Sequence, residues 1–178
     1  CISEIPRGSG NEEEISNYLV QFAKDHGLEV EQDEALNVLI RKPGQNGGED
    51  KPFLALQGHM DMVCEKLVSC PHDFLTEGIQ LKIEDGVLTA DGTTLGADDG
   101  IAVAMMLAIL EDAEMAHPPL ECLFTVSEEI GLLGAAKVSP VWLKSRRLIN
   151  LDSEEEGVCV VGAAGGAAAV ALTHHDGG

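Results

Sequence analysis

Short apolar segments recur along this 178-residue chain, and four of them lead directly into side chains that can bind a metal ion. These side chains are His59 with Asp61, Asp98 with Asp99, Glu128 with Glu129, and Asp152. In open α/β sheets, functional residues gather beyond the carboxyl ends of the strands. The pattern therefore predicts that one imidazole and several carboxylates meet at one edge of a sheet.

The segments between these residues predict strands that alternate with helices. Strands are expected at residues 36–40, 53–56, 120–126 and 147–151, and a hairpin over 79–90 with Asp85–Gly86 at its turn. Residues 101–110 are apolar on every side, which indicates a buried helix. This alternation favours a layered α/β fold.

The first predicted helix has a local start signal. Ser9 is expected to be its N-cap, and Glu12, three residues later, completes the pattern of a capping box. Apolar residues then recur at helical spacing, and Gly27 marks the end. The length suits one compact domain with a core of aliphatic side chains, because aromatic residues make up only 3% of the chain. The Gly/Ala-rich segment 162–169 has no clear assignment.

The chain carries 31 acidic residues against 11 Lys plus Arg, a formal net charge of −20. Such a surface repels nucleic acids and anionic lipids, so neither is an expected partner. The apolar stretch 101–110 is too short to cross a bilayer, and no signal peptide is visible. Some of the carboxylates are expected to cluster in order to hold cations.

The five cysteines are Cys1, Cys64, Cys70, Cys122 and Cys159, and no two of them form a CxxC pair. An odd count without that spacing argues against a disulfide framework and against a cysteine zinc site. Cys122 and Cys159 lie in apolar runs, where cysteine usually acts as a small core residue. We therefore expect a cytoplasmic protein.

Clustered carboxylates raise one another's pKa, and buried charge without a partner is costly, so the pattern favours a bound metal ion. Imidazole with carboxylates suits zinc, with manganese or cobalt as substitutes. Asp61 lies two residues from His59 and is placed to orient its ring. Glu128 and Glu129 are adjacent and point to opposite sides in extended backbone. One of the pair can then bind metal while the other faces the attacking water.

Each motif taken alone has a simpler explanation. Asp98 or Asp99 can cap a helix, the glutamate pair can be a solvated turn, and a lone His59 is more often structural. Asp152 can lie on the surface beside the acidic run 154–156. The joint occurrence of the motifs favours the metal site. The remaining histidines lack such a setting, although His174–His175 can bind metal adventitiously.

Five segments resemble the aminoacyl-histidine dipeptidases (peptidase D), a family of di-zinc metallopeptidases, and they occur in the family's order. The segments are IPRGSG at 5–10, LQGHMDMVCEK at 56–66, GTTLGADDG at 92–100, FTVSEEIG at 124–131 and LINLDSEEEG at 148–157. The resemblance covers nearly the whole chain. It implies a three-layer α/β/α sandwich around a mixed, mostly parallel sheet, of which residues 1–178 are the incomplete N-terminal part.

The resemblance also implies a ligand set for two zinc ions. Asp98 would bridge them, His59 and Asp152 would complete the protein ligands of one, and Glu129 would bind the other. Family members are much longer and carry a lid or dimerisation domain and a late histidine that completes the second site. A homodimeric parent protein is therefore implied. Partial occupancy is expected at the Asp98–Glu129 position of this chain.

The implied activity is hydrolysis of dipeptides, especially those with C-terminal histidine, by a metal-bound hydroxide. Glu128 would be the general base and Asp61 would orient His59. The wider clan implies a cis peptide bond between Asp98 and Asp99. Two alternatives stay open: another co-catalytic zinc aminopeptidase, tripeptidase or amidohydrolase, and a non-catalytic, acidic metal-binding module.

Overall fold

The computed structural model describes residues 1–153, 158, 160 and 161. A five-stranded sheet in the order β1-β2-β6-β3-β7 forms its centre. The strands are β1 (Glu29–Gln32), β2 (Val38–Lys42), β3 (Leu54–His59), β6 (Leu120–Thr125) and β7 (Leu148–Asn150). β3 runs parallel to β6 and β7, whereas β2 is antiparallel to β1 and β6. The predicted mixed sheet is confirmed, with its parallel part in β6, β3 and β7.

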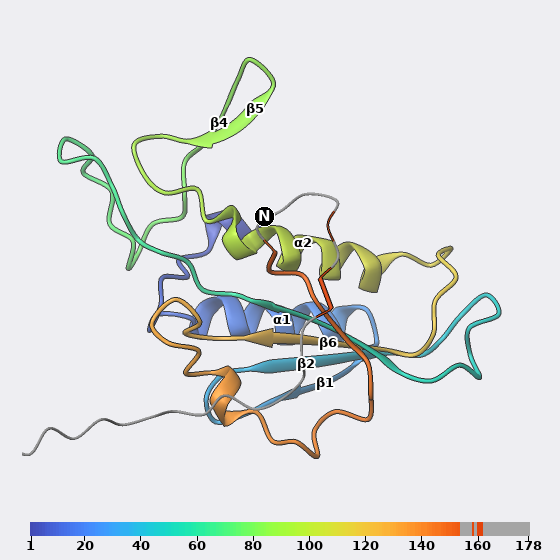
Figure 1. The fold of residues 1–178 in the computed structure, drawn as a ribbon. Helices are drawn as coiled ribbons and strands as arrows, with labels where there is room; N and C mark the ends of the chain where they lie inside the picture. Colours follow the sequence, from blue (N-terminus) through green and yellow to red (C-terminus); the bar gives the residue numbers. More distant parts are fainter. Residues whose placement is uncertain (154–157, 159, 162–178) are drawn as a thin grey trace, which may run out of the picture.

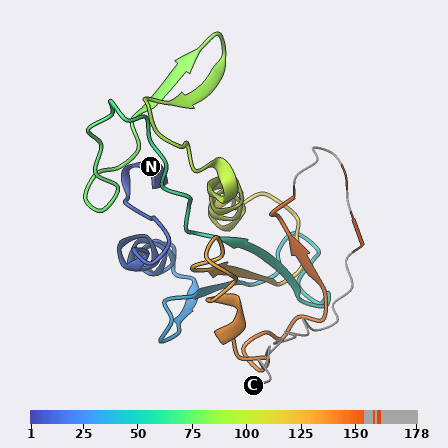
Figure 2. The same cartoon turned by 60° about the vertical axis from the view of Figure 1, so that its left-hand side comes forward.

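Two α-helices, α1 (Glu13–Asp25) and α2 (Ala97–Glu111), cover one face of this sheet (Figures 1 and 2). Both helices pack into one core with the same set of strand residues. That core includes Ile15, Leu19 and Ala23 of α1, Val103, Met106, Leu107 and Leu110 of α2, and Val38, Ile40, Leu56, Cys122 and Phe124 of the strands. Aliphatic side chains therefore supply most of the packing, as the composition predicts.

The opposite face carries the short 3-10 helix η2 (Ala135–Lys137) and the loop that leads to β7 (Figure 1). Glu121 of β6 is fully buried there and accepts hydrogen bonds from the backbone N–H groups of Lys144 and Ser145. Arg41 of β2 donates to the same carboxylate. In the described part of the chain, this face carries no α-helix, so the sheet and one helical layer of the expected sandwich are described.

The predicted capping box at the start of α1 is wrong. The helix begins at Glu13, its N-cap is Glu12, and the N-cap side chain makes no capping hydrogen bond. The Ser9 hydroxyl instead donates to Asp61 Oδ2 at 2.7 Å, and the Glu12 carboxylate accepts hydrogen bonds from Ser127. Tertiary partners have displaced the local ones. The end of the helix near Gly27, where φ is +66°, agrees with the prediction.

α2 differs from the expectation of a helix buried on every side. Its inner face is buried, but Ile101 is 59% exposed and Met105 is 46% exposed. An apolar sequence without periodicity does not indicate which side meets the sheet. β1 was also missed, because its EVEQ sequence is mostly exposed at the sheet edge. None of the described helices is both long and apolar enough to span a bilayer.

The predicted hairpin is confirmed as β4 (Leu81–Glu84) and β5 (Val87–Ala90), and it projects from the body of the fold (Figure 1). Asp85 and Gly86 have positive φ angles of 51° and 81°, as a two-residue hairpin turn requires. A further 3-10 helix, η1, spans Ile2–Glu4.

Cys1, Cys64, Cys70 and Cys122 are free thiols, and Cys122 is buried in the core as predicted. Cys159, the segment 162–169 and His174–His175 lie outside the described residues.

Candidate metal centre

His59 ends β3 and lies among carboxylates at the carboxyl edge of the parallel strands. In the register of these strands, His59 is the partner of Thr125 in β6, and Gln57 is the partner of Asn150 in β7. The acidic residues that follow β6 and β7 therefore lie at the same edge of the sheet as His59. The buried imidazole has its Nε2 atom 3.0 Å from Asp98 Oδ1 and 3.9 Å from Glu128 Oε2.

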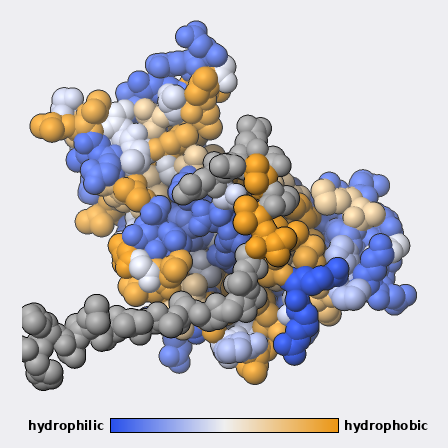
Figure 3. Space-filling model, in the orientation of Figure 1, coloured by the Kyte–Doolittle hydropathy of each residue, from blue (hydrophilic) through white to orange (hydrophobic). Residues whose placement is uncertain are grey.

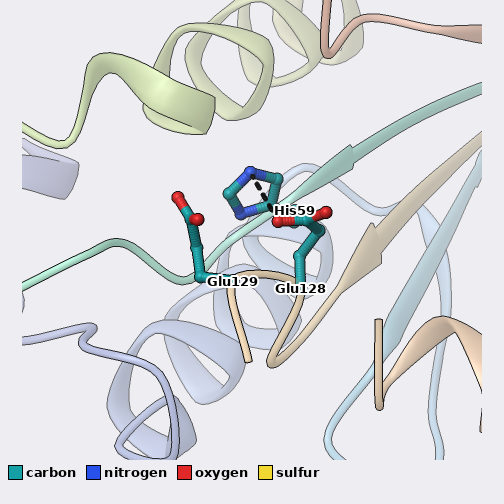
Figure 4. A group of neighbouring side chains, drawn as sticks. All are labelled: His59, Glu128 and Glu129. Atoms are coloured by element: carbon teal, nitrogen blue, oxygen red, sulfur yellow. Dashed lines mark ion pairs between the residues drawn. The ribbon is translucent and has the colours of Figure 1, made fainter. Parts of the chain in front are cut away.

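Two groups of side chains bring their possible ligand atoms within 4.8 Å of one another, and His59 belongs to both. One group adds Asp98 and Asp152, and the other adds Glu128 and Glu129. Figure 4 shows the second group, with the two glutamates on either side of the imidazole ring. The structure thus places the four predicted metal ligands and the predicted general base, Glu128, in two groups that share His59. Their imidazole and carboxylate donors suit zinc and similar divalent ions.

Figure 3 shows a hydrophilic area in the middle of this face of the molecule, in the region where Figure 1 shows the N-terminal end of α2. Burial lowers the pKa of His59, but hydrogen bonds to Asp61 and Asp98 outweigh burial and raise the pKa to about 9. Burial raises the pKa of Glu129, and the neighbouring charges of Asp98 and Glu128 raise it further. The negative charge gathered here is what a bound cation would neutralise.

Asp61 is fully buried and contacts both His59 and the loop that carries Glu128 and Glu129. Its Oδ1 atom lies 3.2 Å from His59 Nδ1, which fits the predicted orienting role. The same carboxylate accepts hydrogen bonds from the backbone N–H groups of Glu128 at 3.0 Å and Glu129 at 3.3 Å, and from the Ser9 hydroxyl. Burial works to raise the pKa of Asp61, but the hydrogen bonds from His59 and Ser9 outweigh it and the pKa is lowered. Asp61 therefore joins the loop after β3 to the loop after β6.

Asp99 supports the site from within, whereas the sequence indicated it only as a possible metal-binding neighbour of Asp98 or as a helix cap. Its Oδ2 atom accepts a hydrogen bond from the His59 backbone N–H at 3.2 Å. A Cβ atom on Gly58 would lie 2.6 Å from this oxygen and 2.7 Å from Ala102 Cβ, so glycine lets α2 approach β3 closely. The Asp98–Asp99 peptide bond is cis, which confirms that expectation.

Arg7 lies in the IPRGSG segment at 5–10, and the sequence alone indicated no role for it. It is only 3% exposed, and its Nη1 atom donates to the carbonyls of Met60 at 3.0 Å and Asp61 at 3.2 Å. Its Nη2 atom donates to the Gly96 carbonyl. One buried guanidinium therefore fixes the loop that carries Asp61 against the loop that carries Asp98.

Replacing Arg7 with alanine is expected to destabilise the protein by roughly 3 kcal/mol or more, because carbonyls that accept from a charged donor lose their partner. Urea unfolding, with the exposed Arg146→Ala variant as control, measures the change. Equal midpoints for the two variants would contradict the proposed function of this contact.

Comparison with known proteins gives consistent matches. The family described as Peptidase family M20/M25/M40 matches residues 55–173. The cytosol non-specific dipeptidase of Escherichia coli (strain K12) is 46% identical over 165 residues, which is 93% of this chain and 34% of that protein.

Solved structures agree with this match. The crystal structure of aminoacylhistidine dipeptidase from Vibrio alginolyticus matches with a TM-score of 0.85 and 44% identity, over 88% of this chain and 32% of that one. A tripeptidase from Staphylococcus aureus matches with a TM-score of 0.71 and 26% identity, over 86% of this chain and 41% of that one. The chain thus spans about a third of the two dipeptidases that it resembles.

Proposed function

This chain belongs to peptidase family M20/M25/M40, and on that premise we propose that the complete protein is a zinc-dependent dipeptidase whose substrates include dipeptides ending in histidine. The observation that carries the proposal is the buried imidazole of His59, which lies within reach of carboxylates from three separate loops. The names of the Escherichia coli and Vibrio alginolyticus relatives, both dipeptidases, support the choice of dipeptides.

His59, Asp98 and Asp152 are proposed to hold one zinc ion, and Asp98 and Glu129 the other. The grouping of His59 with Asp98 and Asp152 supports the first assignment. Glu129 lies in the second group, with His59 and Glu128. When bound, two such ions would make a water molecule more acidic and polarise the scissile carbonyl.

Glu128 is proposed as the general base that takes a proton from the attacking water and passes it to the leaving amine. Its backbone N–H donates to Asp61, while its carboxylate lies 3.9 Å from His59 Nε2. Asp61 holds His59 Nδ1 so that Nε2 faces the other donors. These contacts support separate roles, in which Asp61 orients the His59 ring and Glu128 transfers protons.

Residues 1–178 are proposed to be the N-terminal part of the catalytic domain, in a cytoplasmic and homodimeric parent protein. The name of the Escherichia coli relative, a cytosol dipeptidase, supports that location. Tripeptide hydrolysis is a second candidate, favoured by the match to the Staphylococcus tripeptidase.

A substrate panel on the complete protein separates these activities. We expect dipeptides, including Xaa-His dipeptides, to be cleaved with a kcat/KM at least about tenfold above that for tripeptides. The reason is that the third residue of a tripeptide must fit into a substrate site suited to two residues. Cleavage of N-acylated amino acids alone would indicate an amidohydrolase. A protein that binds zinc and cleaves none of these compounds would be a non-catalytic metal-binding module.

A further inference from the structure

Glu12 has an unusual position for the N-cap residue of a helix, because its side chain turns away from α1. The residue is only 4% exposed, and its Oε1 atom accepts hydrogen bonds from Ser127 N at 2.9 Å and Ser127 Oγ at 2.8 Å. The two residues are 115 positions apart in the chain. A buried carboxylate is costly unless it accepts hydrogen bonds, and Ser127 supplies them here. The Glu12 side chain therefore contacts a distant loop and does not cap the helix.

Ser127 is the residue immediately before Glu128, and its φ angle of +51° lies in the left-handed region. Residues with a side chain seldom adopt that conformation unless the surroundings fix it. Both donor groups of Ser127, its backbone N–H and its hydroxyl, are held by the single oxygen of Glu12. Glu12 thus stabilises the turn by which the chain leaves β6.

The next two backbone N–H groups are also held by a buried carboxylate. Those of Glu128 and Glu129 donate to Asp61, which in turn accepts the hydroxyl of Ser9. Three consecutive N–H groups therefore point at two carboxylates, Glu12 and Asp61. Asn37 joins the two ends of the same loop, because its Oδ1 accepts from Val126 N at 3.1 Å and its Nδ2 donates to the Gly134 carbonyl at 3.0 Å.

We infer that Glu12 is a positioning residue that sets the direction of the Glu128 side chain through Ser127. The inference rests on the proposed function, in which Glu128 transfers protons. Ser9 assists from the same segment by holding Asp61. Glu12 touches none of the proposed metal ligands in the contacts described above, so its removal should change proton transfer more than metal binding.

The first test compares Glu12→Ala and Glu12→Gln in the complete protein. For Glu12→Ala we expect kcat for a dipeptide to fall about 10- to 100-fold, with KM within about threefold of wild type, because a small displacement of a catalytic group has effects of this size. Glu12→Gln should stay within about threefold of wild type in kcat, since an amide oxygen accepts both hydrogen bonds. Glu14→Ala, an exposed acidic residue in the first turn of α1, is the matched control.

A second measurement does not depend on activity. Amide hydrogen exchange in a peptide covering residues 126–130 should be faster in Glu12→Ala than in wild type, and unchanged in Glu12→Gln and Glu14→Ala. Bound zinc should be equal in all of these variants. If Glu12→Ala fails to fold, Ser127→Ala removes only the hydroxyl contact and should show a smaller change in the same direction.

The inference would be overturned if Glu12→Ala had the same kcat and the same amide hydrogen exchange as the wild-type protein. The same criterion applies to Ser127→Ala where that variant is used. A lower melting temperature with unchanged kcat per folded molecule would likewise leave Glu12 a purely structural residue. If the wild-type protein hydrolyses no dipeptide, the proposed function fails, and the exchange data still decide whether Glu12 orders the Glu128 loop.

Discussion

Replacing Glu128 with glutamine is expected to lower kcat for dipeptide hydrolysis by about 10²- to 10⁴-fold, the usual contribution of a general acid–base group. Glutamine fills the same space and leaves the backbone hydrogen bond from residue 128 to Asp61 in place. The side chain, however, can no longer accept the proton of the attacking water. KM and zinc content should therefore change little, because the proposed metal ligands are untouched.

Steady-state kinetics and elemental analysis of the same preparations measure these quantities. Glu14→Gln removes an equal charge from an exposed position and serves as the control. Hydrolysis at the wild-type rate by Glu128→Gln would show that another residue transfers the proton. A large loss of zinc from this variant would instead identify Glu128 as a metal ligand. Its position in the group with His59 and Glu129 makes that alternative testable.

Replacing His59 with alanine is expected to have a comparably large effect by a different route. His59 is the one residue shared by the two groups of potential ligands in the described part of the chain. Without the imidazole, each group consists of carboxylates alone, a donor set better suited to magnesium or calcium than to zinc. We therefore expect zinc content to fall to background and hydrolysis to become undetectable.

Chelation of the wild-type protein should abolish hydrolysis in the same way, and added zinc should restore the wild-type protein but not His59→Ala. Calorimetric zinc titration measures the loss of binding directly. His26→Ala, at the exposed C-terminal end of α1, is the matched control. Zinc affinity equal to that of wild type in His59→Ala would move the metal centre elsewhere.

Much of the fold is predictable because its signals are local. Apolar runs at 120–126 and 147–151 became β6 and β7, and the Asp85–Gly86 turn became the tip of a hairpin. The convergence of His59, Glu128 and Asp152 is also predictable, since parallel strands end at a common edge. The boundaries differ by one to three residues, as they do between the predicted strand 53–56 and β3 (Leu54–His59).

The errors have a common cause in long-range contacts. Ser9 and Glu12 have the spacing of a capping box, but the Ser9 hydroxyl donates to the buried carboxylate of Asp61, and the buried carboxylate of Glu12 accepts from Ser127. These contacts take precedence because a buried carboxylate without hydrogen bonds is costly. α2 is apolar all round, so only its packing on β3 decided that Ile101 faces outward. β1 has too little apolar character for a local signal and exists because β2 pairs with it.

By itself, then, the sequence determined the alternation of strands and helices, the identity of the residues that meet at the sheet edge, and the family motifs that contain them. Only the tertiary structure decided how that edge is held: by Arg7 between two loops, by Asp61 between His59 and the glutamate pair, and by Glu12 against Ser127. The physical reason is that local propensity depends on near neighbours in the chain. The partners of a buried charge are set by the complete packing of the fold.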